Sequence, residues 1–319
     1  MNYWKESLKI GNLIVPRFIG GPLDGVTDSP FRKLVRMFSK DNLLYTELRH
    51  TACVANDKGV TKCLRFDQSE RPLNFQLTTN SLEFVEEACQ RVQKEGVDAI
   101  DLNIGCPAKN IVKSGSGSAM MAEPELLEQV LKLMRKSINI PFTVKMRAGF
   151  KHKNVLEIAK MVEACGADAL AIHPRLQTQK HSGELDFEVV AQVKKTVKIP
   201  VLFSGNIIDF ESAKKTYENT GVDGYLIGRA LWAKPWILKE LEANAEGKEF
   251  VISEHEILAI ALKHLDFDLE FYGDQGLYHF RKYLPYYVKE KSGASEVRKK
   301  LIVSESVEEV KKELTKFLG

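Results

Sequence analysis

Two residues after short apolar runs have side chains suited to catalysis. Cys106 stands between glycine and proline in the segment Asn-Ile-Gly-Cys-Pro at 103–107, ahead of the glycine-rich stretch 113–119. A thiol on such a loop can act as an acid or a nucleophile. Lys145 closes another apolar run, where it could form a Schiff base or place a cation beside an electron-rich cofactor. The residue types alone leave these uses open.

A second group of residues indicates an anion site. Ser204, Gly205 and Asn206 end one apolar run, and Gly228 and Arg229 end the next. Glycine lets the backbone approach a ligand closely, and an arginine can bind an anion with paired donors. We therefore expect a phosphate group to bind here.

The elements that position these residues follow a repeated pattern. Gly-Val-Asp at 96–98, Gly-Ala-Asp at 166–168 and Gly-Val-Asp at 221–223 each precede an apolar run, which predicts a helix ending on glycine and then a buried strand. Pro141 and Pro200 open two further runs at a position where proline costs no ladder hydrogen bond. With 17–20, 43–47 and 73–77, the chain has eight predicted strands, beginning near 17, 43, 73, 99, 142, 169, 201 and 224.

Eight such units in about 230 residues, mostly separated by amphipathic stretches, predict a (β/α)8 TIM barrel of the α/β class. A doubly wound open sheet is the alternative, but no Gly-x-Gly-x-x-Gly follows the first strand. In a barrel the active site forms at the carboxyl ends of the strands. The polar residues there, which we expect to form one site, are Pro22 to Asp24, Glu47, Gln76, Asn103, Cys106, Lys145, Arg147, His173, Arg175, Ser204 to Asn206, Gly228 and Arg229.

Composition is that of an ordinary globular protein. The 319 residues are 44% hydrophobic, and 46 Lys and Arg against 43 Asp and Glu give a net charge of +3, which excludes disordered and coiled-coil classes. Because no apolar run spans a bilayer and the first residues lack a signal peptide's apolar core, we expect a cytoplasmic protein with no membrane partner. The five cysteines form no Cys-x-x-Cys pair, so neither a disulfide framework nor a metal site is expected.

After Trp236 the pattern becomes helical. The polar stretch 242–248 predicts a linker, and helices are expected over 257–272, 276–291, 295–301 and 306–318. This divides the chain into a barrel at 1–243 and a helical domain at 251–319. Segment 281–300 contains seven Lys and Arg against Glu290 and Glu296. It is either a solvated helix face or a contact for a nucleic-acid backbone, with Arg281 and Lys282 as candidates.

Taken together, the motifs resemble the bacterial type of tRNA-dihydrouridine synthase, over nearly the whole chain. The resemblance rests on Pro-Leu-Asp-Gly-Val-Thr-Asp at 22–28, Asn-Ile-Gly-Cys-Pro at 103–107, Val-Lys-Met-Arg at 144–147, Ile-His-Pro-Arg at 172–175 with Gln179 and Gly183, Ile-Gly-Arg-Ala at 227–230 and Phe-Arg-Lys-Tyr-Leu at 280–284. Each motif alone is common, whereas the ordered combination is specific to the family.

This resemblance implies a barrel that holds FMN, a helical domain that grips tRNA, and NADPH-dependent reduction of the C5=C6 bond of uridine in the D-loop region to 5,6-dihydrouridine. Cys106 would be the general acid that gives a proton to C5 while hydride reaches C6. The residues implied to hold FMN are Pro22, Leu23, Asp24, Gln76, Lys145, His173, Ser204, Gly205, Asn206, Gly228 and Arg229. Those implied to face tRNA or its uracil are Asn103, Arg147, Arg175, Arg281 and Lys282.

Three positions depart from the family pattern, namely Ser204, Leu176 and His181, where Asn, Thr and Tyr are usual. Other interpretations are an FMN barrel acting on a small molecule, a Schiff-base aldolase using Lys145, and an RNA-binding protein without chemistry. The basic tail argues against the first, and the presence of both Cys106 and Lys145 argues against the last.

Overall fold

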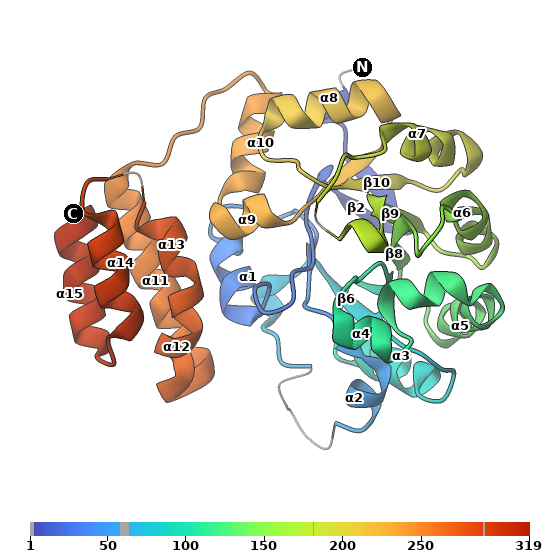
Figure 1. Cartoon of the computed structure of the whole chain (residues 1–319), viewed down its shortest axis with the longest axis horizontal. Helices are drawn as coiled ribbons and strands as arrows, with labels where there is room; N and C mark the ends of the chain where they lie inside the picture. The colour runs from blue at the N-terminus through green and yellow to red at the C-terminus, as the bar shows by residue number, and fades with distance from the viewer. Residues whose placement is uncertain (1–2, 58–63, 181, 290) are drawn as a thin grey trace.

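Eight parallel strands form a closed barrel in a computed structural model, which describes residues 3–57, 64–180, 182–289 and 291–319 (Figure 1). The barrel strands are β3 (Phe18–Gly20), β4 (Leu44–Tyr45), β6 (Leu73–Thr78), β7 (Ala99–Ile104), β8 (Phe142–Gly149), β9 (Ala169–Leu176), β10 (Val201–Ser204) and β11 (Gly224–Ile227). They pair in the order β4-β3-β11-β10-β9-β8-β7-β6, and pairing of β4 with β6 closes the ring. The short strand β5 (Arg49–His50) pairs with the end of β6. The predicted TIM barrel is confirmed, and every predicted strand is present.

Amphipathic helices surround the strands and cover their outer faces (Figure 1). They are α1 (Ser29–Arg36), α3 (Val85–Lys94), α5 (Pro124–Ser137), α6 (Val155–Ala164), α7 (Phe187–Thr196), α8 (Phe210–Thr220) and α10 (Ile237–Ala245). Short helices α2 (Thr51–Ala55), α4 (Lys109–Lys113) and α9 (Arg229–Ala233) lie in the connecting segments. No helix among the described residues is both long and apolar enough to cross a membrane.

The amino end of the barrel is filled with apolar side chains. An antiparallel hairpin of β1 (Leu8–Ile10) and β2 (Leu13–Val15) packs there against Ile19, Leu202 and Leu226. Burial of this apolar layer stabilises the closed barrel and leaves the polar interior positions at the opposite, carboxyl end. That end is where the site forms.

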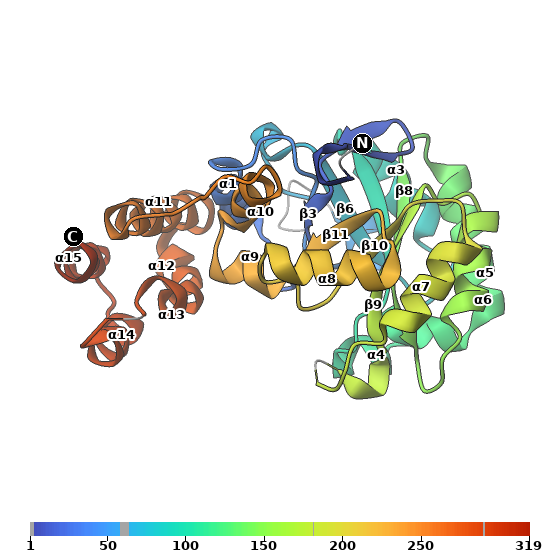
Figure 2. The ribbon, with the colours of Figure 1, turned by 90° about the horizontal axis from the view of Figure 1, so that it is seen from above.

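The described residues of the C-terminal region form five α-helices. This region lies to one side of the barrel (Figure 2). The helices are α11 (Glu254–Tyr272), α12 (Gly276–Phe280), α13 (Leu284–Tyr287), α14 (Ala294–Val303) and α15 (Val307–Leu318). The helix expected over 276–291 is interrupted by a tight turn at Arg281–Tyr283, next to Pro285 in the first turn of α13. Proline has no backbone N–H to donate to the preceding turn, so the α-helical pattern cannot continue through it.

The linker lies later than expected, because α10 continues to Ala245. Leu241 is fully buried, and Asn42 Nδ2 donates to Glu242 Oε1 at 2.6 Å, so the start of the stretch 242–248 packs on the barrel. The non-helical connection covers 246–253, and Ser253 then caps α11 by accepting from the backbone N–H of Glu256.

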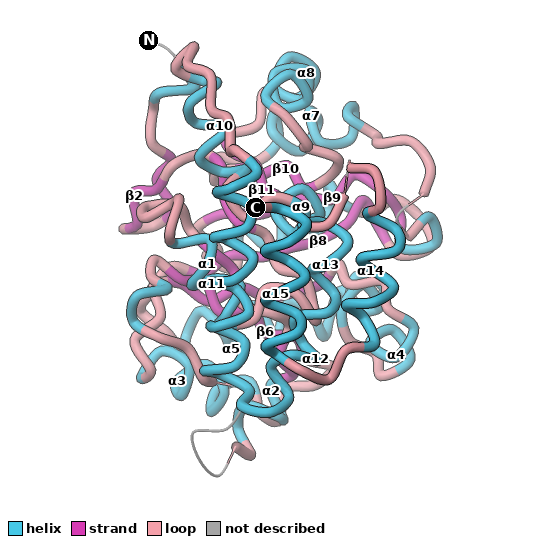
Figure 3. The backbone as a smooth tube through the Cα atoms, turned by 90° about the vertical axis from the view of Figure 1, so that its left-hand side faces the viewer, coloured by secondary structure: helices cyan, strands magenta, loops and turns pink. Residues whose placement is uncertain are grey.

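The helical region contacts the barrel at the loop between β3 and α1. Helix α11 packs along α1, as Figure 3 shows from the side of the helical region. Tyr283 donates its hydroxyl to the carbonyl of Val26 at 2.8 Å, and Tyr272 donates to Asp28 Oδ2 at 3.0 Å. Lys282 Nζ also lies 3.4 Å from Asp28 Oδ2, and Asp28 is buried. The loop between β3 and α1 thus receives three polar contacts from the helical region, in addition to the packing of α11 on α1.

Candidate active site

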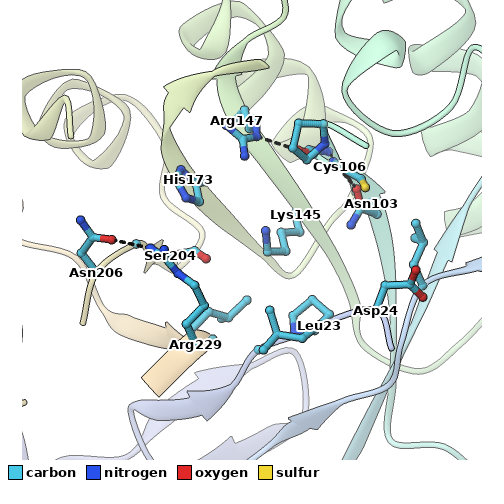
Figure 4. A pocket seen from close by; sticks show the side chains of 18 of the residues that line it. Leu23, Asp24, Asn103, Cys106, Lys145, Arg147, His173, Ser204, Asn206 and Arg229 are labelled. Atoms are coloured by element: carbon cyan, nitrogen blue, oxygen red, sulfur yellow. Dashed lines mark hydrogen bonds between the residues drawn. The ribbon is translucent and has the colours of Figure 1, made fainter. Parts of the chain in front are cut away.

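A cavity of about 880 Å³ opens at the carboxyl ends of the barrel strands (Figure 4). Its volume lies in the range of roughly 300–1,000 Å³ common to ligand pockets. Among the residues that line it, those predicted from the sequence are Pro22, Leu23, Asp24, Gln76, Asn103, Cys106, Lys145, Arg147, His173, Ser204, Gly205, Asn206, Gly228 and Arg229. The structure thus brings together residues from all but one of the strand ends that were predicted to form the site. The exception is Glu47 after β4, which instead accepts from the N–H of Gly25 at 2.7 Å.

Cys106 lies on a loop whose backbone is fixed from two sides. Asn103 Oδ1 accepts from the N–H of Gly105 at 3.0 Å and from that of Cys106 at 2.8 Å. The carbonyl of Cys106 accepts from Ser118 Oγ at 2.9 Å. Gly117 has a φ of +59°, and a Cβ there would lie 2.9 Å from that carbonyl, so only glycine fits. The half-buried thiol is therefore held at the cavity wall.

Arg147 braces the same loop from the other direction. Its Nε donates to the carbonyl of Gly105 at 2.8 Å, and its Nη1 donates to the carbonyls of Leu176 at 3.0 Å and Lys180 at 2.8 Å. Burial lowers the pKa of Arg147 to about 10. The guanidinium thus ties the loops after β7 and β9 together. Because Leu176 contributes its backbone here, its departure from the family pattern does not remove this contact.

Lys145 projects into the middle of the cavity, between Cys106 and Arg229 in Figure 4. Burial, followed by the charge of Arg147, lowers the pKa of Lys145 to about 8, against the opposing effects of Asp101 and Cys106. An amine with this pKa is mostly a cation at neutral pH and can neutralise a negative charge that develops nearby. The same pKa suits a Schiff-base lysine, so geometry alone does not separate the two uses.

A polar layer beneath the cavity was missed by the sequence analysis. Gln76 Nε2 donates to Asp101 Oδ2 at 2.8 Å, and Thr143 Oγ1 donates to Asp101 Oδ1 at 2.6 Å. Burial raises the pKa of Asp101 to about 7. The signal was present in the sequence: Asp101 is a charged residue inside an apolar run, two positions before Asn103 and so on the same face of β7.

The opposite side of the cavity holds an oriented cation. Asn206 has a φ of +50°, and its Oδ1 accepts from Arg229 Nη2 at 2.8 Å. Gly205 lies close to Leu185 and Pro174, where a Cβ would crowd Leu185 at 3.3 Å. With the backbone held close and the guanidinium exposed, this corner can bind an anionic group through Arg229 and loop N–H groups.

Three residues predicted to contact the substrate do not line the cavity. Arg175 is buried and donates from Nε to the carbonyl of Gly183 at 2.9 Å, and its burial lowers its pKa. Arg281 donates to the carbonyl of Ser304 at 2.7 Å, and Lys282 faces Asp28 as described above. Their roles toward RNA remain predictions.

Most cations of the predicted basic segment have partners within the protein. Lys291 pairs with Glu254 at 2.5 Å and Lys300 with Glu313 at 2.8 Å, while Arg298 donates to a backbone carbonyl at 2.6 Å. Lys299 is exposed. Glu290 of this segment, and the family departure at His181, lie outside the described residues.

Comparisons with known proteins agree with the motifs. The family model described as dihydrouridine synthase matches residues 19–318. A probable tRNA-dihydrouridine synthase 1 from Synechocystis is 33% identical over 313 residues, covering 97% of this chain and 88% of its own. A tRNA-dihydrouridine synthase B from Pseudomonas aeruginosa is 33% identical over 297 residues, covering 91% of this chain and 90% of its own.

Solved structures share the barrel. A variant of NCR from Zymomonas mobilis aligns with a TM-score of 0.59 at 14% identity, covering 77% of this chain and 92% of its own. Morphinone reductase in complex with tetrahydroNAD aligns with a TM-score of 0.55 at 12% identity, covering 76% of this chain and 91% of its own. These likenesses support the fold, and the sequence matches confirm the resemblance of the motifs: the chain belongs to the dihydrouridine synthase family of oxidoreductases.

Proposed function

We propose that this protein is an FMN-dependent tRNA-dihydrouridine synthase that reduces the C5=C6 bond of uridine in the D-loop region, with NADPH as reductant and Cys106 as general acid. One observation carries the proposal. A single cavity, in a chain of this family, presents a fixed thiol, a central lysine and an oriented arginine.

The cavity residues fit a flavin mononucleotide. The volume suits a ligand of this size, and the Asn206–Arg229 corner offers an oriented cation for its phosphate. Lys145 provides a half-buried cation for the electron-rich edge of the ring system, and Gln76 has a second amide hydrogen that its bond to Asp101 leaves free to donate. When bound, reduced FMN supplies the hydride that is added to C6.

Cys106 is placed to complete the reduction. Addition of hydride to C6 leaves negative charge that a proton at C5 must quench, and a thiol at the cavity wall can deliver that proton. Asn103 and Ser118 hold the Cys106 backbone, so the thiol remains at the wall without needing to be ordered by the substrate.

The substrate must enter as an unstacked base. A uridine in folded tRNA has to be turned out before its C5=C6 bond can meet the cavity, which requires contacts with the neighbouring backbone. Lys109 and Lys180 are exposed and Lys234 is half-buried, and all three line the cavity, where they can meet phosphates. We assign catalysis to the barrel at 1–243 and tRNA grip to the helical region at 251–319, including Arg281 and Lys282.

The visible spectrum of the purified protein, followed during anaerobic addition of NADPH, tests the cofactor. A flavin spectrum that bleaches, followed by dihydrouridine formation in unmodified tRNA, supports the proposal. A protein that neither contains nor takes up FMN would overturn it, and trapping of a substrate on Lys145 by borohydride would then favour an aldolase.

A further inference from the structure

A chain of hydrogen bonds links the floor of the barrel to the Cys106 loop. The backbone N–H groups of Gly105 and Cys106 donate to Asn103 Oδ1 at 3.0 and 2.8 Å. Asn103 Nδ2 donates to Gln76 Oε1 at 2.8 Å, and Gln76 Nε2 donates to Asp101 Oδ2 at 2.8 Å. Asn103, Gln76 and Asp101 are 5%, 1% and 0% exposed, so these hydrogen bonds are largely shielded from bulk water.

The direction of this chain is set at its upper end. Backbone N–H groups can only donate, so Asn103 must turn its oxygen toward the loop and its NH2 group toward Gln76. Gln76 must in turn present its oxygen to Asn103 and its NH2 group downward. The residue beneath Gln76 therefore has to accept.

The lower end of the hydrogen-bond chain also requires residue 101 to accept a hydrogen bond. Asn74 Nδ2 donates to Thr143 Oγ1 at 2.9 Å, and the Thr143 hydroxyl donates to Asp101 Oδ1 at 2.6 Å. Both oxygens of Asp101 thus receive a hydrogen. A carboxylate accepts from both neighbours as they stand. An amide would turn its NH2 group toward Gln76 or toward Thr143, and the Thr143 hydroxyl could receive it only by redirecting its hydrogen from residue 101 to Tyr45 Oη, 3.3 Å away.

We propose that Asp101 is a positioning residue: as the acceptor at which the chain ends, it fixes the amides of Gln76 and Asn103 and thereby holds the backbone of the Cys106 loop. Asp101 does not line the cavity and touches no reacting atom. Its effect on catalysis rests on the proposed function, because it acts by keeping the Cys106 thiol at the cavity wall. The ordering of the loop itself does not depend on which reaction follows.

Amide hydrogen exchange of the peptide spanning 103–108 measures this role directly in the full-length protein without tRNA. The measurement is made at about pH 8, where Asp101, whose pKa burial raises to about 7, is mostly a carboxylate. In Asp101→Asn we expect the Gly105 and Cys106 amides to exchange about 10- to 100-fold faster, since a buried, charge-assisted chain of hydrogen bonds is broken. The matched control is Asp168→Asn, which alters a carboxylate that accepts from the Phe142 N–H and Arg135 at the start of β9. It should leave exchange at 105–106 unchanged, whatever its effect on the melting temperature.

A double variant that exchanges the carboxylate and the amide between positions 101 and 76 tests the direction of the hydrogen bonds separately from a general loss of stability. In the double variant Asp101→Asn with Gln76→Glu, the carboxylate introduced at position 76 can accept both from Asn103 and from the amide introduced at position 101. The oxygen of that amide can still accept from Thr143, so every donor–acceptor pair is restored. We expect the exchange rates to return to those of the wild type, even where Asp101→Asn alone fails to fold.

Wild-type exchange rates in Asp101→Asn would overturn the proposal, as would a double variant that fails to fold or still exchanges fast. If the proposed function also holds, Asp101→Asn lowers kcat for dihydrouridine formation by about 10-fold or more, with little change in KM for tRNA. If wild-type protein forms no dihydrouridine but the exchange results are as expected, the proposed function fails and the positioning role stands.

Discussion

Replacing Lys145 with methionine should stabilise the flavin-free protein. Methionine keeps the length and apolar volume of the side chain but removes a charge that the folded state accommodates poorly. A lysine whose pKa falls from its ordinary value of 10.5 to about 8 costs the folded protein about 3 kcal/mol at pH 7. Removing that cost should raise the melting temperature by several degrees. The same variant should bind FMN about 10- to 100-fold more weakly, because it loses a charged hydrogen-bond donor in the cavity.

Thermal unfolding at a series of pH values tests this reasoning. Because the folded-state pKa of Lys145 is lowered, the unfolded chain binds the extra proton between pH 8 and 10.5, and wild-type stability gains over this range. The stability that Lys145→Met gains over the wild type should therefore be complete below pH 8 and should disappear by about pH 10.5. Lys109→Met, at an exposed lysine of the same cavity, is the control and should change little. A lower melting temperature for flavin-free Lys145→Met at neutral pH, or a difference that does not shrink with pH, would refute the argument.

Four further changes probe the other parts of the structure. Cys106→Ala should retain flavin but lower turnover on tRNA about 100-fold or more, and loss of the flavin spectrum would instead make Cys106 structural. Arg229→Met should raise the Kd for FMN about 10-fold or more in a fluorescence titration, and unchanged binding would remove Arg229 from the phosphate site. Glu70→Gln should lower the free energy of unfolding by about 3 kcal/mol in urea denaturation, because it leaves Arg32, which is 2.6 Å from Glu70 and equally buried, without its counter-charge. Lys299→Glu, at an exposed position, should raise the Kd for tRNA without changing NADPH oxidation. A Kd for tRNA equal to that of the wild type would argue against a tRNA contact at Lys299.

The sequence predicted the barrel well because its signals are local. A glycine that ends a helix, an aspartate and a buried apolar run are neighbours in the chain, and this repeated pattern located three of the strands. Two apolar runs opened by proline and three further apolar runs located the other five. The site followed from the fold, since parallel strands bring their carboxyl ends together whatever the sequence separation. Cys106, Lys145 and Arg229 could therefore be placed on one cavity before any contact was known.

The remaining features depend on partners that are distant in the sequence. Counting charges in segment 281–300 gave a basic surface, but pairing with residues such as Asp28, Glu254 and Glu313 is decided only by the folded arrangement. Asp101 carried a local signal, a charge inside an apolar run, but the hydrogen bonds that reach it from other strands could not be derived from that signal. The interruption of the helix expected over 276–291, by contrast, could have been predicted from the sequence, because Pro285 is a local signal.

The loop at 22–28 belongs to both parts of the protein. Pro22, Leu23 and Asp24 form cavity wall, while Val26 and Asp28 accept hydrogen bonds from the helical region within the same turn. Thr27 closes this turn by bonding to the backbone of Leu23, which links the cavity-lining residues to those that face the helical region. The boundary between the two parts is thus not modular: a helical region taken from another protein would also have to supply the donors that hold the loop forming this cavity wall.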